Sequence, residues 1–498
     1  MNSRDLRKFE LLAAVLLGAL LAGTLRPAAV LAADLSLQPC RLEHPRGLSS
    51  VAARCGRLSV PENPDNPAGR HIELAVTVVP AVSTRAQPDP LFLLAGGPGQ
   101  GAREGFAGLL GALAGVRRHR DLVLLDQRGT GDSNPMNCNV PEESWTDTNV
   151  STETFRSLAR ECLATLPGDP RFYTTSVAVR DLDAVRAALG YTRINLYGGS
   201  YGTRVAQHYA RRHPDRVRAM ILDAVVPPQL ALGASISLDA DAALRRHFAR
   251  CAADAECAGR FPSLAADFDA LRARLARASA TVQMPDPVSG ESRTIEFTTG
   301  HFALAVRILT YSDLGVALLP LMVDEAAARG NLTPLAAQAE MLREELLGAL
   351  AYGMHHSVVC TEDLPFLDRE ALDRGALRRT YLGEVMLDGL DATCSVWPRG
   401  PIDPDFKEPL RSATPTLLLS GGVDPVTPPA YGTLAAVGLA DHAHIVFAGQ
   451  GHTQLRLACA QLLVRRFIDA GTTTGLDAAC ADTVGPAPFF LSFSGGAP

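Results

Sequence analysis

The sequence has very little lysine and no concentrated positive charge. Only Lys8 and Lys407 among its 47 basic residues are lysines, and the formal net charge of the 498-residue chain is −6. Because no run rich in lysine and arginine occurs, the charge pattern typical of a nucleic-acid-binding protein is missing. Aromatic residues make up only 6%, while 47% of residues are hydrophobic and 20% are charged. This composition is ordinary for a globular protein and argues against disordered, collagen-like and multi-span membrane proteins.

The sequence also lacks any Cys-x-x-Cys pair, which argues against a zinc site or a thioredoxin-like redox motif. Its ten cysteines are even in number and spread along the chain. Thiols in an exported protein tend to oxidise, so we expect five disulfides. Many pairings are possible, and the simplest joins neighbours along the chain: Cys40–Cys55, Cys138–Cys162, Cys251–Cys257, Cys360–Cys394 and Cys459–Cys480.

The first 33 residues have the layout of an export signal. Arg4, Arg7 and Lys8 precede an apolar stretch at 11–25, and small residues follow up to Ala33. A basic start, a short apolar segment and a small-residue cleavage site are typical of a secretory signal peptide. We therefore predict a bacterial protein that is periplasmic or secreted after cleavage.

Two alternatives to a cleaved signal are open. An uncleaved membrane anchor is one, although roughly 15 apolar residues are few for a membrane span. A lipoprotein signal ending at Cys40 is the other, but Pro39 stands where a small residue is normal and lipidation would leave one cysteine unpaired. We expect no stable membrane association after cleavage. The sequence says nothing about the oligomeric state.

Short apolar segments alternate with helical patterns over much of the chain. Strands are expected at 72–79, 91–95, 121–126, 193–197, 217–223, 415–420 and 443–448. Most of the later ones are continuous apolar runs, as in strands that are covered on both faces. Helical spacing is present at 175–190 and at 203–213. The alternation predicts an α/β fold with a mostly parallel sheet and helices on both faces.

This alternation is interrupted after a pair of prolines at 227–228. The pattern then becomes mainly helical, for example at 241–255 and 261–280, until strand-like sequence resumes at Pro415. An insertion between two parts of one sheet explains this better than three serial domains. The expected divisions are a core first part at 34–228, a helical cap at 229–410 and a core second part at 411–498.

A turn typical of a nucleophilic serine lies at residues 198–202, Gly-Gly-Ser-Tyr-Gly. It follows an expected strand and precedes an expected helix, which is the context that a Gly-x-Ser-x-Gly elbow requires. The glycines allow a tight turn that lifts the serine hydroxyl above the sheet. We predict that Ser200 is a nucleophile. The alternative is a glycine-rich loop with an inert serine.

A nucleophilic serine needs a base and a carboxylate that orients it. Asp424 and His452 each follow one of the last two expected strands, in Gly-Gly-Val-Asp-Pro and Gly-Gln-Gly-His. The chain order serine, aspartate, histidine is that of the α/β-hydrolase elbow enzymes, and open α/β sheets place their sites at the carboxyl ends of strands. We favour Asp424 as the acid. Asp223, at the end of strand 217–223, is the alternative.

The glycine-rich loop at 96–101, Gly-Gly-Pro-Gly-Gln-Gly, follows strand 91–95. Acyl transfer places negative charge on a carbonyl oxygen, which backbone N–H groups stabilise. In hydrolases with a Gly-x-Ser-x-Gly elbow, one N–H group comes from the residue after the nucleophile and another from such a loop. In this sequence we expect them to be the N–H groups of Tyr201 and Gly97. A phosphate-binding loop is the competing interpretation. No Gly-Lys-Ser/Thr follows, however, and Pro98 has no N–H to donate.

Together these motifs resemble the α/β-hydrolase family of proline iminopeptidases and secreted tripeptidyl aminopeptidases. The resemblance rests on Gly-Gly-Pro-Gly at 96–99, Asp-Gln-Arg-Gly-Thr-Gly at 126–131, the elbow at 198–202, Asp424 and His452. It covers most of the mature chain, and the region from about 390 is similar to the tripeptidyl-aminopeptidase ending. Many relatives carry histidine before Gly-Gly-Pro-Gly where Ala95 stands here. That departure affects local hydrogen bonding and leaves the oxyanion backbone intact.

The resemblance implies an enzyme that cleaves peptides from a free N-terminus through an acyl-enzyme, with no metal or organic cofactor. It also implies acidic residues that bind the substrate ammonium, for which Glu362 and Asp363 are the best candidates. A solvated acidic pair at a helix end is the alternative for these two. The cap is expected to exclude long or folded substrates. An esterase or lipase with the same triad, and a non-catalytic binding protein, are the other function classes.

Overall fold

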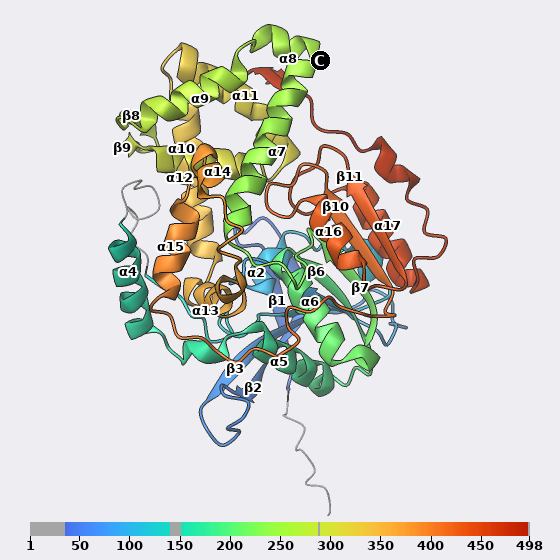
Figure 1. Cartoon of the computed structure of the whole chain (residues 1–498). Coiled ribbons are helices and arrows are strands. Elements are labelled where there is room, and N and C mark those ends of the chain that lie inside the picture. The colour runs from blue at the N-terminus through green and yellow to red at the C-terminus, as the bar shows by residue number, and fades with distance from the viewer. Residues whose placement is uncertain (1–34, 140–150, 287–288, 497–498) are drawn as a thin grey trace, which may run out of the picture. The chain divides into compact units, whose positions relative to one another are not determined.

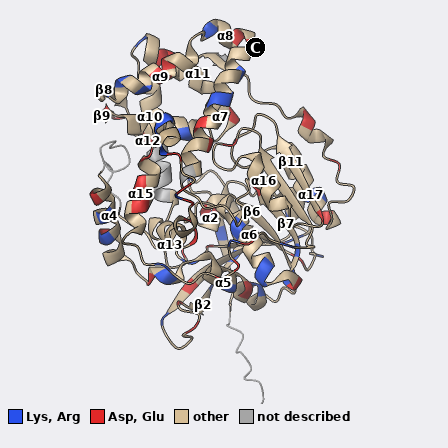
Figure 2. Cartoon of the chain, in the orientation of Figure 1, with Lys and Arg blue, Asp and Glu red and all other residues tan. Residues whose placement is uncertain are grey.

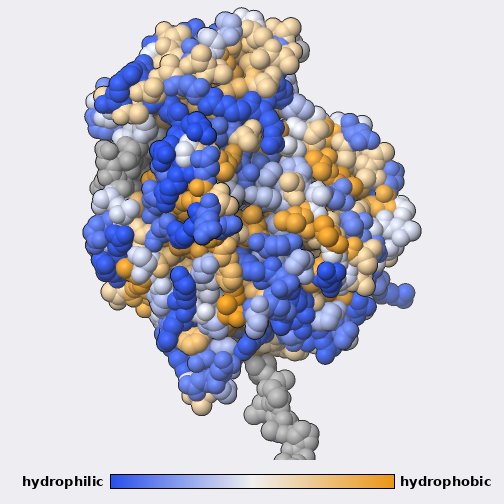
Figure 3. Space-filling view, in the orientation of Figure 1, coloured by the Kyte–Doolittle hydropathy of each residue, from blue (hydrophilic) through white to orange (hydrophobic). Residues whose placement is uncertain are grey.

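The computed structural model describes residues 35–139, 151–286 and 289–496, so the predicted signal segment lies outside the described residues. In those ranges no helix combines the length and the apolar character that a membrane crossing requires. Figure 2 shows acidic and basic residues interspersed over the elements. The face in Figure 3 is mostly hydrophilic, with separate apolar patches.

A large sheet forms the centre of the molecule (Figure 1). Its strand order is β1 (Gln38–Glu43), β2 (Ser50–Pro61), β3 (His71–Val79), β5 (Leu122–Leu125), β4 (Leu91–Leu94), β6 (Ile194–Gly199), β7 (Val217–Asp223), β10 (Thr416–Gly421) and β11 (His442–Phe447). The strands from β5 to β11 in this order are parallel, whereas β1, β2 and β3 pair antiparallel. All seven strands expected from the sequence are therefore confirmed, within two residues at each end. The carboxyl ends of the parallel strands share one edge.

Helices cover both faces of the sheet, as predicted. The first face packs against α5 (Thr175–Ala188), α6 (Tyr201–Arg212) and α16 (Pro429–Ala436), and the second against α2 (Ala102–Ala107), α3 (Ala114–Arg117) and α17 (Ala458–Ala470). Strand β4 shows why its sequence is apolar throughout. Phe92 and Leu94 enter the first core, while Leu91 and Leu93 enter the second. A strand buried on both faces needs no polar alternation.

Between β7 and β10 the chain forms a cap. Its elements are α7 (Ala234–Ala253), α8 (Ala255–Arg260), α9 (Leu264–Leu275), β8 (Ala280–Pro285), β9 (Ser292–Phe297), α10 (Thr299–Leu309), α11 (Asp313–Ala328), α12 (Thr333–Ala349), α13 (Tyr352–Glu362), α14 (Arg374–Arg379) and α15 (Val385–Cys394). Elements α7 to α12 have their own apolar core, in which Phe268, Phe297 and Phe302 are fully buried. The antiparallel hairpin β8–β9 within this insertion was not expected from the sequence.

The last part of the insertion packs on the core. Ala351, Met354 and Val358 join the apolar cluster beside β6 and α6. Helix α15 packs against α4 (Thr152–Thr165), and both are tied by disulfides, Cys138–Cys162 and Cys360–Cys394. The other three bridges also follow the neighbour pairing, so all five predicted disulfides are confirmed. Short 3₁₀ turns lie at η2 (Pro170–Phe172), η3 (Pro214–Arg216), η4 (Leu364–Phe366) and η5 (Ala479–Thr483).

The C-terminal residues differ from the expected division, which assigned all of 411–498 to the core. Residues 484–496, here called the C-terminal strap, leave the core after η5 and reach the cap, where they form β12 (Phe490–Ser492) and β13 (Gly495–Gly496) (Figure 1). Phe489 is buried in the cap core, and Arg250 lies 3.9 Å from the centre of its ring. Arg250 also donates to the Ala487 carbonyl. The strap is therefore a third connection between core and cap, besides the two ends of the insertion.

We expect Phe489→Ala to weaken the cap more than its neighbour Phe493→Ala does. Removing a buried phenylalanine costs about 3 kcal/mol or more, whereas an exposed one costs less than about 0.5 kcal/mol. Phe489 is 5% exposed and Phe493 57%. Denaturant unfolding of the two variants beside the wild type checks this. Equal midpoints would show that the strap does not stabilise the cap.

Candidate active site

Ser200 stands on the sharp turn between β6 and α6. Its φ of +54° lies in the left-handed region, which a non-glycine residue adopts only when the surrounding structure holds it there. The two flanking glycines are required by space. A Cβ at Gly198 would collide with the backbone of Gly202, and one at Gly202 would collide with the Leu94 carbonyl. The turn thus presents the Ser200 side chain at the carboxyl end of the sheet.

The glycine-rich loop after β4 lies directly against this serine. A Cβ at Gly96 would be 3.1 Å from the Cβ of Ser200. Tyr201 is the first residue of α6, and a residue in that position has no acceptor for its N–H within the helix. Gly97 has a φ of +105°, which glycine adopts without strain. The loop and the helix start therefore meet beside the Ser200 hydroxyl, as an oxyanion site requires.

The cap holds this loop from the other side. The Ala351 N–H donates to the Gly99 carbonyl at 2.9 Å, and His355 Nδ1 lies 3.2 Å from the Pro98 carbonyl. Burial lowers the pKa of His355, against the opposing effect of the Pro98 carbonyl. The neutral ring can donate its Nδ1 proton to that carbonyl. The shape of the glycine-rich loop at 96–101, here called the oxyanion loop, thus depends on the insertion as well as on the sheet.

Asp424 and His452 form a hydrogen-bonded pair. His452 Nδ1 lies 2.9 Å from Asp424 Oδ2 and 3.1 Å from Oδ1. Asp424 is fully buried, which by itself raises the pKa of its carboxyl. The interaction with His452 and the amide donors of Thr427 and Val426 outweigh burial and hold the pKa of Asp424 below its usual value. An ionised carboxylate on Nδ1 leaves Nε2 of the imidazole free to accept a proton.

Asp223, the alternative acid, has a different position. Its carboxylate accepts the N–H groups of Gln454 and Leu455 and the hydroxyl of Tyr197, and its carbonyl accepts the N–H of Ser200 at 2.9 Å. Burial raises the pKa of Asp223 to about 6, opposed by these donors. The structure places Asp424, and not Asp223, against the His452 ring. Asp223 instead joins the Ser200 turn to the loop that carries the histidine.

Two neighbours of His452 were not identified from the sequence. The Thr427 hydroxyl donates to Asp424 Oδ2 at 2.7 Å and lies 3.3 Å from His452 Nδ1. Threonine three residues after an aspartate is a signal for such a local bond. Tyr311 comes from the cap, and its ring meets the His452 ring edge to face at 5.3 Å while its carbonyl accepts the His452 N–H. No sequence pattern links positions 311 and 452.

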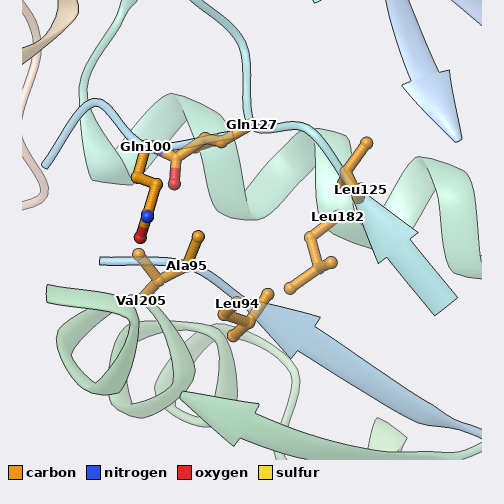
Figure 4. Close-up of a pocket in the computed structure, with 8 residues that line it drawn as sticks. Leu94, Ala95, Gln100, Leu125, Gln127, Leu182 and Val205 are labelled. Carbon is orange, nitrogen blue, oxygen red and sulfur yellow. The ribbon is translucent and has the colours of Figure 1, made fainter. Parts of the chain in front are cut away.

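A small cavity lies behind the elbow (Figure 4). It measures about 20 Å³, room for one water molecule, and its polar lining comes from Gln100 and Gln127 among apolar side chains. Gln127 also donates to the Tyr201 hydroxyl. The cavity is too small for an amino-acid side chain, so it is not a substrate pocket. Arg128, the next residue, pairs with Asp181 in the core at 2.6 Å.

Glu362 and Asp363 are both fully buried at the end of α13. Asp363 faces Arg204 at 2.9 Å and Lys407 at 3.3 Å, and these cations hold its pKa low in spite of burial. Glu362 accepts the N–H and the hydroxyl of Thr175, and burial raises its pKa to about 7. The Thr175 hydroxyl in turn lies 2.6 Å from that of Tyr201. The pair is therefore not the solvated acidic pair of the alternative.

Among the residues that the structure describes, no group of three or more histidine, cysteine, aspartate or glutamate side chains is arranged to hold a metal ion. At this end of the sheet lie the Asp424 carboxylate, the His452 imidazole and the backbone amides after β4 and Ser200. Such a set suits nucleophilic attack on a carbonyl carbon.

Two family models match the chain. One, described as the alpha/beta hydrolase fold, matches residues 89–282, and the other, described as a TAP-like protein, matches residues 379–480. The first range contains the oxyanion loop and Ser200, and the second contains Asp424 and His452. These matches confirm the predicted fold and the family resemblance that the motifs indicated.

Curated relatives bear both peptidase and esterase names. Serine protease Hip1 of Mycobacterium tuberculosis is 27% identical over 496 residues, which cover 89% of this chain and 90% of that protein. The tripeptidyl aminopeptidase of Streptomyces lividans is 32% identical over 191 residues, or 35% of this chain and 36% of that protein. Carboxylesterase B of Mycobacterium tuberculosis is 35% identical over 228 residues, which cover 42% of this chain and 43% of that protein.

We expect Asp424→Asn to lower kcat far more than Thr427→Val. The amide favours the wrong tautomer of His452, which in serine proteases costs about 10⁴-fold, whereas losing one hydroxyl bond to the carboxylate costs about tenfold. Steady-state kinetics on one chromogenic substrate, with thermal unfolding as the control for folding, measure both. Similar small losses would contradict the assignment of Asp424 as the orienting acid.

Proposed function

We propose that this chain, an α/β hydrolase with a TAP-like C-terminal region, is an exported serine peptidase that acts at the free N-terminus of peptides. The observation that best supports the proposal is the Asp424–His452 pair, whose loop is tied to the Ser200 turn through Asp223. The serine protease and aminopeptidase names of two relatives support peptides as the substrates. Five disulfides are in keeping with an oxidising compartment.

In the proposed mechanism, His452 takes the proton of Ser200 while the serine oxygen attacks the substrate carbonyl. The N–H groups of Gly97 and Tyr201 hold the resulting oxyanion. His452 then protonates the leaving amine, and its charge is stabilised by Asp424 throughout. In the second half of the reaction His452 takes a proton from water, and the water oxygen attacks the acyl carbonyl. The bond to Ser200 then breaks, and His452 returns the proton to the serine oxygen. The chemistry needs no metal or organic cofactor.

An exopeptidase is favoured over an endopeptidase because of the cap. Tyr311 from the cap lies on His452, and the segment around Ala351 lies on the oxyanion loop. A folded protein substrate would have to displace these contacts. The release of one residue, as in proline iminopeptidases, or of three, as in tripeptidyl aminopeptidases, fits the same arrangement.

Glu362 is the better candidate for recognising the substrate ammonium. Asp363 is already neutralised by Arg204 and Lys407. In the described part of the chain the hydrogen bonds of Glu362 go to Thr175, and the nearby Arg204 charge lowers its pKa, against the larger effect of burial, without pairing with it. Because Glu362 is fully buried behind Tyr201, it would act through its charge and not by direct contact. Its effect on substrate choice is therefore expected to be modest.

A carboxylesterase is the second candidate, supported by the relative of that name. It would use the same triad, so only substrates distinguish the two. The test is a panel of free and N-acetylated aminoacyl, prolyl and tripeptidyl chromogenic amides beside short p-nitrophenyl esters. We expect selective cleavage of the free-amine amides, with a loss of about 10⁴-fold or more in Ser200→Ala. Ester turnover without amide cleavage would establish the esterase instead.

We further expect the preference for free over acetylated amides to rise with pH through about 7, the pKa of Glu362. Above this pH the carboxyl is charged and attracts the substrate ammonium, whose own pKa is about 8. In Glu362→Gln the preference should fall about threefold to tenfold and lose this rise, as expected for a screened charge at a distance. If the preference rose equally with pH in Glu362→Gln, the pH dependence would belong to another titrating group.

A further inference from the structure

Arg307, on the cap helix α10, has a guanidinium group with no ion-pair partner among the described residues. Its Nη2 lies 3.3 Å from the Tyr311 hydroxyl, and its Nη1 is buried with no hydrogen-bond partner among the described residues. Burial lowers the pKa of Arg307, but Tyr311, Tyr381 and the Asp424 carboxylate outweigh it, so the group stays ionised. A buried cation without a negative partner destabilises the fold unless another group neutralises its charge.

The most deeply buried arginines among the described residues are paired with carboxylates. Arg128 faces Asp181, and Arg204 faces Asp363. Arg307 has no carboxylate within ion-pair distance in the described part of the chain. Arg250 in the cap also has none, but it lies on the Phe489 ring of the C-terminal strap and donates to a carbonyl there.

Arg307 differs from these arginines because one side chain, that of Tyr311, contacts both Arg307 and His452. The Tyr311 side chain touches Arg307 with its hydroxyl and the His452 ring with its edge or face. The backbone of Tyr311 also holds the His452 N–H. One tyrosine therefore separates the guanidinium from the imidazole that, in the proposed mechanism, hands a proton to the leaving amine.

In a serine hydrolase the catalytic histidine lies on the side of the leaving group, because it protonates that group. The leaving amine must come within hydrogen-bond reach of the imidazole, and in a peptide the next atoms are the α-carbon and its carboxyl group. A guanidinium and a phenol hydroxyl form a pair of donors suited to a carboxylate. We propose that Arg307 and Tyr311 bind a carboxylate on the leaving residue of the substrate.

This inference rests on the proposed peptidase function and narrows its substrates. The carboxylate has two possible sources: the free C-terminus of a leaving amino acid or short peptide, and the side chain of an acidic leaving residue. The first would make the enzyme a peptidase of very short peptides. Both share one chemistry, and substrates can separate them.

The test uses substrates with one common free-amine acyl part and different leaving residues. These are alanine, alanine amide, glutamate amide, glutamine amide and a neutral p-nitroanilide. The wild type should prefer a carboxylate-bearing leaving group over its neutral counterpart by about tenfold to a hundredfold in kcat/KM, the usual worth of a charge-assisted hydrogen bond. A preference for alanine over its amide assigns the C-terminus, and one for glutamate amide over glutamine amide assigns the side chain.

Variants connect the preference to the residues. Arg307→Gln should bring the ratio of charged to neutral substrates close to one, mainly through KM, and Arg307→Lys should restore part of it. Tyr311→Phe keeps the ring on His452 and should lower the ratio less. Arg250→Gln, a cap arginine on the strap, should leave the ratio unchanged.

Two results would overturn the inference while the proposed function stands. One is a wild type that cleaves the anilide but shows no carboxylate preference, and the other is a preference that persists in Arg307→Gln. Failure of the wild type to cleave the anilide or any peptide would contradict the proposed function itself, and this inference with it.

Discussion

The geometry of the site depends on the hydrogen bonds of Asp223 at the end of β7. Its backbone carbonyl holds the N–H of Ser200, and its carboxylate holds the N–H groups of Gln454 and Leu455, just after His452. Strand β7 lies between β6 and β10, so this one buried residue links the Ser200 turn to the loop that carries His452. The Tyr197 hydroxyl completes the set of donors. The unusual backbone of Ser200 is sustained by these bonds, which would be lost if Asp223 moved.

The cap adds parts that the sheet alone does not supply. Tyr311 covers His452, and the Ala351 and His355 groups hold the oxyanion loop. The strap then joins the end of the chain to the cap through Phe489. A site assembled from both layers can exclude water and restrict the substrate at once, which a bare sheet edge cannot do.

Local patterns predicted the core and the polar groups at its strand ends. Apolar runs such as Leu91–Leu94 have few alternatives to a buried strand, and Gly198 and Gly202 have no room for a side chain. The cap contacts could not be predicted, because Tyr311 meets His452 across 141 positions without any periodic signal. The path of the strap was missed for the same reason. The hairpin β8–β9 is local, and the alternation of polar and apolar residues at 281–284 is a strand signal that the mainly helical interpretation of 229–410 did not use. The sequence also favours Asp424 over Asp223 as the acid, and the hydrogen bond between Asp424 and the His452 ring agrees with this preference.

The most direct test of the central claim is chemical labelling of the nucleophile. The protein is treated with an organophosphonate that reacts with activated serines, and the digested adduct is located by mass spectrometry. The account predicts one adduct, on Ser200, at a rate that falls sharply when His452 is replaced by glutamine. An adduct on another serine, or reaction at the rate of an ordinary surface hydroxyl, would contradict it.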